Sequence, residues 1–354
     1  MERHQLESCP VIAETNISVL RVAGDKVYKT KQPRTFPFVD QKSLTDRQRL
    51  CHQEVELNRR FSPDVYVGVE DITDGGETVD VAVVMERMSS ERSLTRLLEA
   101  GVDVEECVKD VARQMAIYHQ SAPRSAHISE AGTYGAVKEL WRLSLQEMEA
   151  FVPSLLDPSV FREVSNRSAQ YLAGRQTLFD FRVGLGLIVD GHGDLLADDI
   201  YCLKDGPRLL DCLEFDERFR FSDVLLDLAF LAMDLKRLGH AHLAKVFVDE
   251  YVDLAGEHHP TSLTHHYIAL PGARALQSPV LPSTIGCCRS CSAGQSPAGP
   301  GGQQFVTRRS PPHSGRRASG HRKDDRGRDD VGALLVDGPV NRRHPPRNRR
   351  CSGR

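Results

Sequence analysis

Long apolar runs are absent from this chain of 354 residues, and none approaches the length that a helix needs to cross a bilayer. The first residues are polar, and no signal-peptide hydrophobic stretch follows them. We therefore expect no membrane partner and a cytoplasmic location. An apolar content of 40% is still enough to build the core of one large or two ordinary domains.

Cysteines are few and scattered. Residues 1–270 contain five of them, widely spaced: Cys9, Cys51, Cys107, Cys202 and Cys212. In a chain without an export signal, this spacing favours reduced, mostly buried thiols and no disulfide framework. Cys287, Cys288 and Cys291 contain a single CxxC motif without the second ligand pair of a zinc site, so we expect no zinc there.

Charge divides the chain into two parts. Residues 271–354 hold 16 Lys and Arg against 5 Asp, a balance of +11, whereas residues 1–270 hold 30 against 44, a balance of −14. The second part also contains 10 Pro and 12 Gly without sustained periodicity, which is typical of disorder. We therefore expect an acidic folded part and, over residues 271–354, a disordered basic tail.

Residues 1–88 are predicted to form a small antiparallel β-rich lobe with one helix. The expected elements are a hairpin over 17–31, a helix over 43–61, and strands over 65–69 and 79–88.

Helical periodicity dominates residues 89–270, which predicts a larger helical lobe. Helices are expected over 93–98, 104–120, 135–151, 158–172, 222–238 and 240–255 and from about 261, with short strands at 186–189 and 207–210. The fold class predicted from this order is α+β.

An acidic run between those two strands carries the clearest chemistry. Residues 192–201 read HGDLLADDIY, and residues 209–216 read LLDCLEFD. Phosphoryl transfer needs a group that accepts the proton of the attacking hydroxyl, and oxygen ligands for magnesium ions on the phosphates. Asp194 suits the first role, and Asp199 and Asp211 suit the second. Asp205 and Gly206 are interpreted only as a hairpin turn.

The run HGDLLADDI resembles the HGDLHxxN catalytic loop of aminoglycoside phosphotransferases and their protein-kinase-like relatives, and LLDCLEFD resembles their metal-binding IDW segment. The resemblance covers about residues 12–270 and implies a bilobal protein-kinase-like fold. It makes Asp194 the catalytic residue and Asp211 the principal magnesium ligand, with Asp227 stabilising the loop. Two residues depart from the pattern: Leu196 replaces a second His, and Asp199 replaces Asn as a metal ligand.

A kinase-like site also needs a strand lysine on the nucleotide phosphates and a helix carboxylate that orients it. Lys29 and Glu54 suit these roles, with Lys31 and Glu56 as nearby substitutes. The alternative is a solvated lysine and an exposed helix charge.

The segment Glu86 to Met88 lies where the family places its interlobe hinge, so its backbone is expected to meet adenine. A buried strand end would explain the same residues. No Gly-rich phosphate loop precedes Lys29.

The segments EVELNRRF (residues 54–61) and HGDLLADDIYCLKDGPRLLDCLEFDERFRF (residues 192–221) resemble the N-terminal half of actinobacterial two-domain proteins, in which a P-loop kinase domain follows. Several codons can encode each of residues 316–325. If these codons are read one nucleotide later, they can encode GGLPGTGKTT, a P-loop of the GxxxxGK[ST] type. The same shift lets residues 270–278 become YRALVRSKV, which would continue a helix. We therefore expect a frameshift near Leu270. Early stop codons in the shifted frame of the coding DNA would exclude it.

The sequence thus predicts an ATP- and Mg²⁺-dependent phosphotransferase acting on a hydroxyl of a small-molecule acceptor. One alternative is an inactive remnant or nucleotide-binding module, which fits Asp199 and the missing Gly-rich loop. A weaker one is a nucleic-acid binder that uses residues 341–350, although this segment lacks interleaved aromatic residues.

Overall fold

A five-stranded antiparallel sheet forms the N-terminal part of this computed structural model, which describes residues 1–275 apart from 16, 37–38 and 155. The strands lie in the order β1-β2-β3-β5-β4. Their bounds, with those of the short helix before them, are α1 Arg3–Ser8, β1 Val11–Glu14, β2 Ser18–Ala23, β3 Lys26–Lys31, β4 Tyr66–Asp74 and β5 Glu77–Glu86.

One helix, α2 (Leu44–Asn58), packs against β4 and β5. It begins after Ser43, whose Oγ accepts a hydrogen bond of 3.0 Å from the backbone N–H of Asp46. Cys51 and Val55 on its buried face join the apolar cluster of the sheet. This packing places the polar residue Glu54, on the same helix, beside the sheet.

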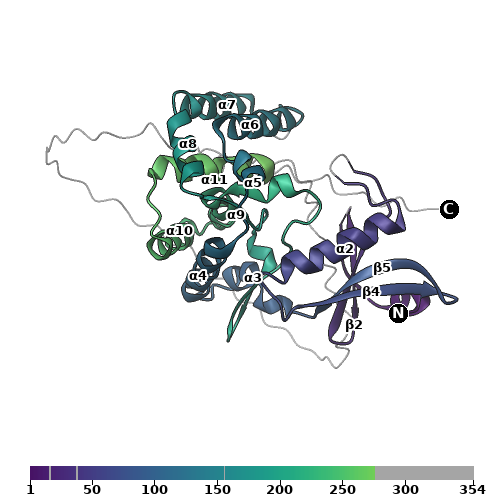
Figure 1. Cartoon of the computed structure of the whole chain (residues 1–354). Helices are drawn as coiled ribbons and strands as arrows, with labels where there is room; N and C mark the ends of the chain where they lie inside the picture. The colour runs from purple at the N-terminus through teal and green to yellow at the C-terminus, as the bar shows by residue number, and fades with distance from the viewer. Residues whose placement is uncertain (16, 37–38, 155, 276–354) are drawn as a thin grey trace, which may run out of the picture. The chain divides into compact units, whose positions relative to one another are not determined.

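Helices make up most of the following part (Figure 1). Their bounds are α3 Leu94–Glu99, α4 Glu105–Ser121, α5 Ala126–Glu130, α6 Tyr134–Glu149, α7 Pro158–Leu172, α8 Gln176–Gly184, α9 Val224–Arg237, α10 Ala241–Ala255 and α11 Thr261–Ala275. Every residue of α9 from Val224 to Leu235 is buried, and α9 packs against both α10 and α11. A helix that is buried all round forms the centre of a core.

Two short antiparallel strand pairs hold the acidic run. β6 (Ile188–Asp190) pairs with β9 (Phe221–Asp223), and β7 (Ile200–Leu203) pairs with β8 (Gly206–Leu209). Residues 204–205 form the turn between β7 and β8, one residue before the turn expected at Asp205 and Gly206, and Gly206 is the first residue of β8. The loop after β6 and the segment after β8 are thereby brought together.

The α+β fold class is confirmed: an antiparallel sheet with one long helix precedes a helical part. The sequence did not reveal α1, β1, α5, α8, β7 and β9, because elements this short carry little periodicity. Helix α11 runs through Ala275, past the boundary expected at residue 270. The prediction of disorder is therefore wrong for residues 271–275, which are helical. The rest of the expected tail, the absence of a zinc site and the frameshifted P-loop concern residues outside the described ones.

The expectation of reduced thiols is wrong for two of the five cysteines. Cys107 on α4 and Cys202 on β7 form a disulfide, whereas Cys9, Cys51 and Cys212 are free. Helix α4 packs beside β8, the partner strand of β7, and so brings together two cysteines 95 residues apart. Spacing along the sequence carries no information about such a contact.

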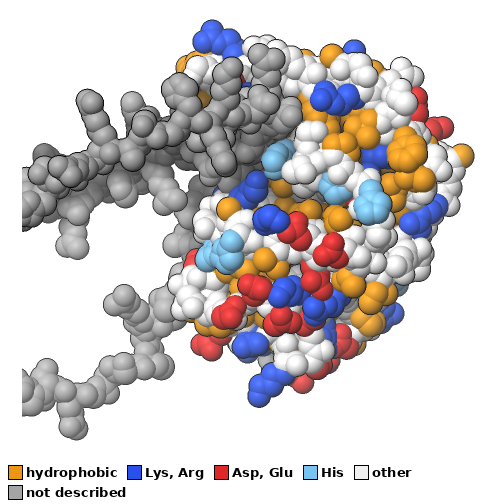
Figure 2. All heavy atoms as spheres, turned by 90° about the vertical axis from the view of Figure 1, so that its left-hand side faces the viewer, with side chains coloured by type: hydrophobic (Ala, Val, Ile, Leu, Met, Phe, Trp, Pro, Cys, Tyr) orange, Lys and Arg blue, Asp and Glu red, His pale blue; other side chains and the backbone are white. Residues whose placement is uncertain are grey.

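The surface in Figure 2, seen from the left-hand side of Figure 1, carries acidic and basic side chains that lie intermixed. This face therefore does not present the continuous basic stripe of a nucleic-acid binder. None of the helices within residues 1–275 is long and apolar enough to span a membrane.

Candidate active site

The loop after β6 is held in shape by one buried carboxylate. Asp227 on α9 is fully buried, and its two oxygens accept hydrogen bonds from the backbone N–H groups of His192 (2.9 Å) and Gly193 (2.8 Å). The imidazole of His119 lies 3.0 Å from the same carboxylate. Burial opposes the ionisation of Asp227, but these hydrogen bonds outweigh it and lower the pKa. Asp227 thus stabilises the loop, as the sequence led us to expect.

Two glycines allow the loop to approach its neighbours closely. A Cβ atom on Gly191 would lie 2.4 Å from Oδ2 of Asp227. Gly193 has a φ of +85°, and a Cβ there would lie 3.0 Å from the carbonyl oxygen of Phe219. The loop that presents half-buried Asp194 therefore requires both glycines.

Asp199 and Asp211 lie at the base of the hairpin formed by β7 and β8. The backbone N–H of Leu210 donates to the carbonyl oxygen of Asp199 at 2.9 Å, which holds the two chain segments side by side. Asp211 has a φ of 63° and is, within the described ranges, the only residue other than glycine with a positive φ. Its N–H donates to Oη of Tyr66 at 3.1 Å. Strained backbone of this kind clusters at functional sites.

The acidic side chains affect one another electrostatically. Burial raises the pKa of Asp199 well above its usual value, and the charges of Asp211, Asp194 and Asp198 raise it further. A bound cation would relieve this repulsion. No group of three or more His, Cys, Asp or Glu side chains in the described part of the chain could hold a metal by itself. Magnesium sites commonly combine one or two carboxylates with phosphate oxygens and water.

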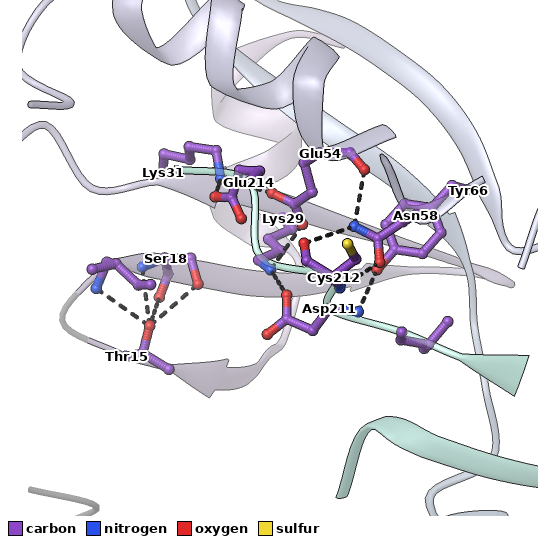
Figure 3. A network of polar contacts seen from close by, with 12 residues as sticks. Thr15, Ser18, Lys29, Lys31, Glu54, Asn58, Tyr66, Asp211, Cys212 and Glu214 are labelled. Atoms are coloured by element: carbon purple, nitrogen blue, oxygen red, sulfur yellow. Dashed lines mark hydrogen bonds and ion pairs between the residues drawn. The ribbon is translucent and has the colours of Figure 1, made fainter. Parts of the chain in front are cut away.

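Lys29 on β3 connects the sheet, α2 and the acidic segment (Figure 3). Its Nζ lies 2.8 Å from Oε1 of Glu54 and 2.6 Å from Oδ1 of Asp211. Burial disfavours the charged amine, but both carboxylates raise the pKa of Lys29, so it stays protonated. The structure therefore brings Lys29 and Glu54 together, whereas Glu56 on the same helix is exposed.

A second buried lysine contacts the other side of Glu54. Nζ of Lys31 lies 2.7 Å from Oε2 of Glu54 and 2.6 Å from Oε1 of Glu214 (Figure 3). Burial alone would raise the pKa of Glu54, but the two lysines lower it to about 2. The place of Glu214 was not apparent from the sequence. The available signal was the two-residue spacing of Lys29 and Lys31, which places both on one face of a strand.

Another missed group anchors the start of the loop. Asp190, the last residue of β6, accepts hydrogen bonds from Arg60 (2.8 Å) and Arg220 (2.7 Å). Arg60 follows α2, so this ion pair joins the sheet-bearing part to the helical part.

Glu86 and Met88 lie where β5 leaves the sheet. The carboxylate of Glu86 pairs with Lys26, and its backbone N–H donates to the carbonyl oxygen of Val65 at 2.8 Å. The N–H of Arg87 donates to the carbonyl oxygen of Asp25, also at 2.8 Å. Met88 is half-buried and packs against the apolar cluster of the sheet. An adenine ring would therefore have to use other backbone groups of this segment.

A comparison with models of known protein families finds no match. Uncharacterised proteins of Mycobacterium tuberculosis and Mycobacterium bovis are 37% identical to this chain over 259 residues, which cover 73% of this chain and 52% of theirs. The chain thus spans about half the length of the curated relatives it matches.

Among solved structures, an aminoglycoside phosphotransferase in complex with GDP and kanamycin has a TM-score of 0.46 at 15% identity, covering 76% of this chain and 85% of its own. A choline kinase of Cryptosporidium parvum has a TM-score of 0.46 at 12% identity, covering 77% and 83%. An aminoglycoside phosphotransferase of Alicyclobacillus acidocaldarius has a TM-score of 0.42 at 15% identity, covering 75% and 79%.

Proposed function

We propose that the chain is an ATP- and Mg²⁺-dependent phosphotransferase of the aminoglycoside phosphotransferase-like type, acting on a hydroxyl group of a small-molecule acceptor. The observation that carries the proposal is the contact of Lys29 with both Glu54 and Asp211. A strand lysine, a helix glutamate and a carboxylate after a hairpin are the parts that protein-kinase-like catalysis requires.

Each residue has a role that follows from its place. Glu54 orients the protonated Nζ of Lys29 toward a nucleotide phosphate. Asp199 and Asp211 would hold magnesium, which neutralises charge on the phosphates when bound. Asp194, on the loop that Asp227 fixes, would orient the acceptor hydroxyl and accept its proton.

The nucleotide base would lie against the end of β5. Met88 and Leu210 both pack against the apolar cluster of the sheet, and Leu210 directly precedes Asp211. An adenine ring placed against these side chains would have its phosphates close to Lys29. Backbone groups between Glu86 and Met88 would contact its polar edge.

Phosphate transfer from ATP to a panel of small hydroxyl compounds tests this proposal. We expect Asp194→Asn to reduce transfer at least a hundredfold while ATP still binds, because general-base catalysis typically contributes about 10² to 10⁴ in rate. Asp205→Asn is the matched control, because Asp205 is an exposed aspartate in the turn between β7 and β8 and is not one of the charges that act on Asp199. Equal rates for wild type and Asp194→Asn would reject the role of Asp194.

A nucleotide-binding module without transfer is the second candidate, and the place of Asp199 favours it. Asp199 adds a carboxylate to an already repelling cluster, where the related catalytic loops have a neutral Asn. If the chain binds ATP but transfers phosphate to no acceptor, even with Asp199→Asn, this candidate replaces the first.

A further inference from the structure

A second ion pair lies next to the candidate site, between Lys31 and Glu214. The side chain of Lys31 is 2% exposed and that of Glu214 is 7% exposed, and the two atoms Nζ and Oε1 are 2.6 Å apart. Removing two charges from water costs several kcal/mol per ion unless close partners compensate. A pair buried this deeply therefore needs further nearby charges or hydrogen bonds to offset the lost hydration, and Glu54, which contacts Lys31, is one of these partners.

Glu54 is shared between two lysines, one on each oxygen. Its Oε1 contacts Lys29 and its Oε2 contacts Lys31, which in turn contacts Glu214 (Figure 3). Glu214 lies three residues after Asp211 on the same segment. A chain of charges thus runs from helix α2 through Lys31 to the segment that carries the proposed magnesium ligand.

The same segment is attached to α2 at a second point. The side chain of Asn58, one helical turn after Glu54, accepts a hydrogen bond from the N–H of Cys212 at 2.8 Å. Its Nδ2 also donates to the carbonyl oxygen of Cys212 at 3.3 Å. Residues 211–214 are therefore held to α2 by Asn58 near one end and by Lys31 near the other.

We infer that Lys31 and Glu214 are positioning residues that fix the segment of Asp211 to the helix of Glu54. This inference rests on the proposed function. A nucleotide phosphate bound at Lys29 would weaken the attraction between Lys29 and Asp211. The Lys31–Glu214 pair does not involve Asp211, so it would still hold the segment of Asp211 in place for the metal.

Shape-preserving substitutions in the full chain separate this role from simple packing. Glu214→Gln removes the charge at nearly constant volume, and Glu214→Asp keeps the charge on a shorter side chain. Glu257→Gln is the matched control, because Glu257 is a buried carboxylate that pairs with Arg182 in the helical part. It should lower the melting temperature without affecting the nucleotide site.

The readout is binding of a non-hydrolysable ATP analogue, measured by calorimetry over a range of Mg²⁺ concentrations. We expect Glu214→Gln to raise the half-saturating Mg²⁺ concentration about tenfold, since loss of a group that orients a metal ligand typically weakens metal binding 10- to 100-fold. Glu214→Asp should give a smaller shift. The double variant Lys31→Met/Glu214→Gln should show the same Mg²⁺ dependence as Glu214→Gln. It should also melt at a higher temperature than Lys31→Met, because Lys31→Met alone leaves the buried carboxylate of Glu214 without its lysine.

Three results would overturn the inference. The first is an unchanged Mg²⁺ dependence in Glu214→Gln, or in Glu214→Asp if the former does not fold. The second is an equal shift in Glu257→Gln, which would mean that lost stability alone explains the effect. The third is a wild-type chain that binds no analogue at any Mg²⁺ concentration, and only this result also rejects the proposed function.

Discussion

The hydrogen bond between Trp141 and His266 makes folding stability depend on pH in a predictable way. Nε1 of Trp141 on α6 donates to Nε2 of His266 on α11 at 2.8 Å, and both side chains are buried. His266 also stacks on Tyr171, with ring centroids 4.2 Å apart. Burial, with a smaller contribution from the charge of Arg175, lowers the pKa of His266 to about 3.

The sign and size of the effect follow from proton linkage. A histidine in the unfolded chain takes up a proton near pH 6.5, whereas folded His266 stays neutral until about pH 3. The unfolded chain therefore binds more protons below pH 6.5, and stability falls as the pH falls through this window. Between pH 7 and pH 5 the loss from this one group is about 2 kcal/mol of unfolding free energy.

Urea unfolding at the two pH values, followed by fluorescence, measures this loss. Trp141 is the only tryptophan in the chain, so its emission reports on the region around His266. The control is His266→Gln, whose amide oxygen can accept the Trp141 hydrogen bond but does not titrate. We expect wild type to lose about 2 kcal/mol more than His266→Gln between pH 7 and pH 5. Equal losses in the two proteins would refute the reasoning.

Two further predictions concern the framework of the site. Asp227→Asn weakens the hydrogen bonds to the loop and breaks a buried charge-assisted network. In urea unfolding it should lower the unfolding free energy by about 3 kcal/mol. An unchanged urea midpoint would contradict the loop-stabilising role of Asp227. The cross-link between Cys107 and Cys202 closes a loop of 95 residues, so the variant with serine at both positions should lose up to about 5 kcal/mol of unfolding free energy. A reductant should lower the melting temperature of wild type only, and identical melting of the two proteins without reductant would show that the disulfide does not form.

The sequence was informative where a local pattern decides the structure. Alternating apolar residues around Gly24 marked the β2–β3 hairpin, and the spacing of Leu50, Val55 and Leu57 marked α2. The expected pairing of Lys29 with Glu54 came instead from the resemblance to a kinase-like site, which needs a strand lysine and a helix carboxylate. Local periodicity placed the two residues on a strand and a helix, but it did not show that they meet.

The features that were missed depend on contacts between distant segments. The sequence around Glu214 does not distinguish it from other charged residues. Its contact with Lys31, 183 residues away in the sequence, arises only in the folded chain, after the β7–β8 hairpin. The disulfide between Cys107 and Cys202 likewise arises from the packing of α4 beside that hairpin. The local sequence around Asp211 did not indicate its positive φ, because residues other than glycine seldom adopt this conformation.

ATP binding by wild type and by Asp211→Asn, measured by calorimetry with and without Mg²⁺, tests the central claim most directly. Asparagine is the better replacement because it tolerates the φ of 63° at this position, so lost binding cannot be attributed to backbone strain. We predict that wild type binds ATP more tightly when Mg²⁺ is present and that Asp211→Asn loses most of this gain. Equal Mg²⁺-dependent binding by the two proteins would contradict the assignment of a phosphotransferase site to Lys29, Glu54 and Asp211.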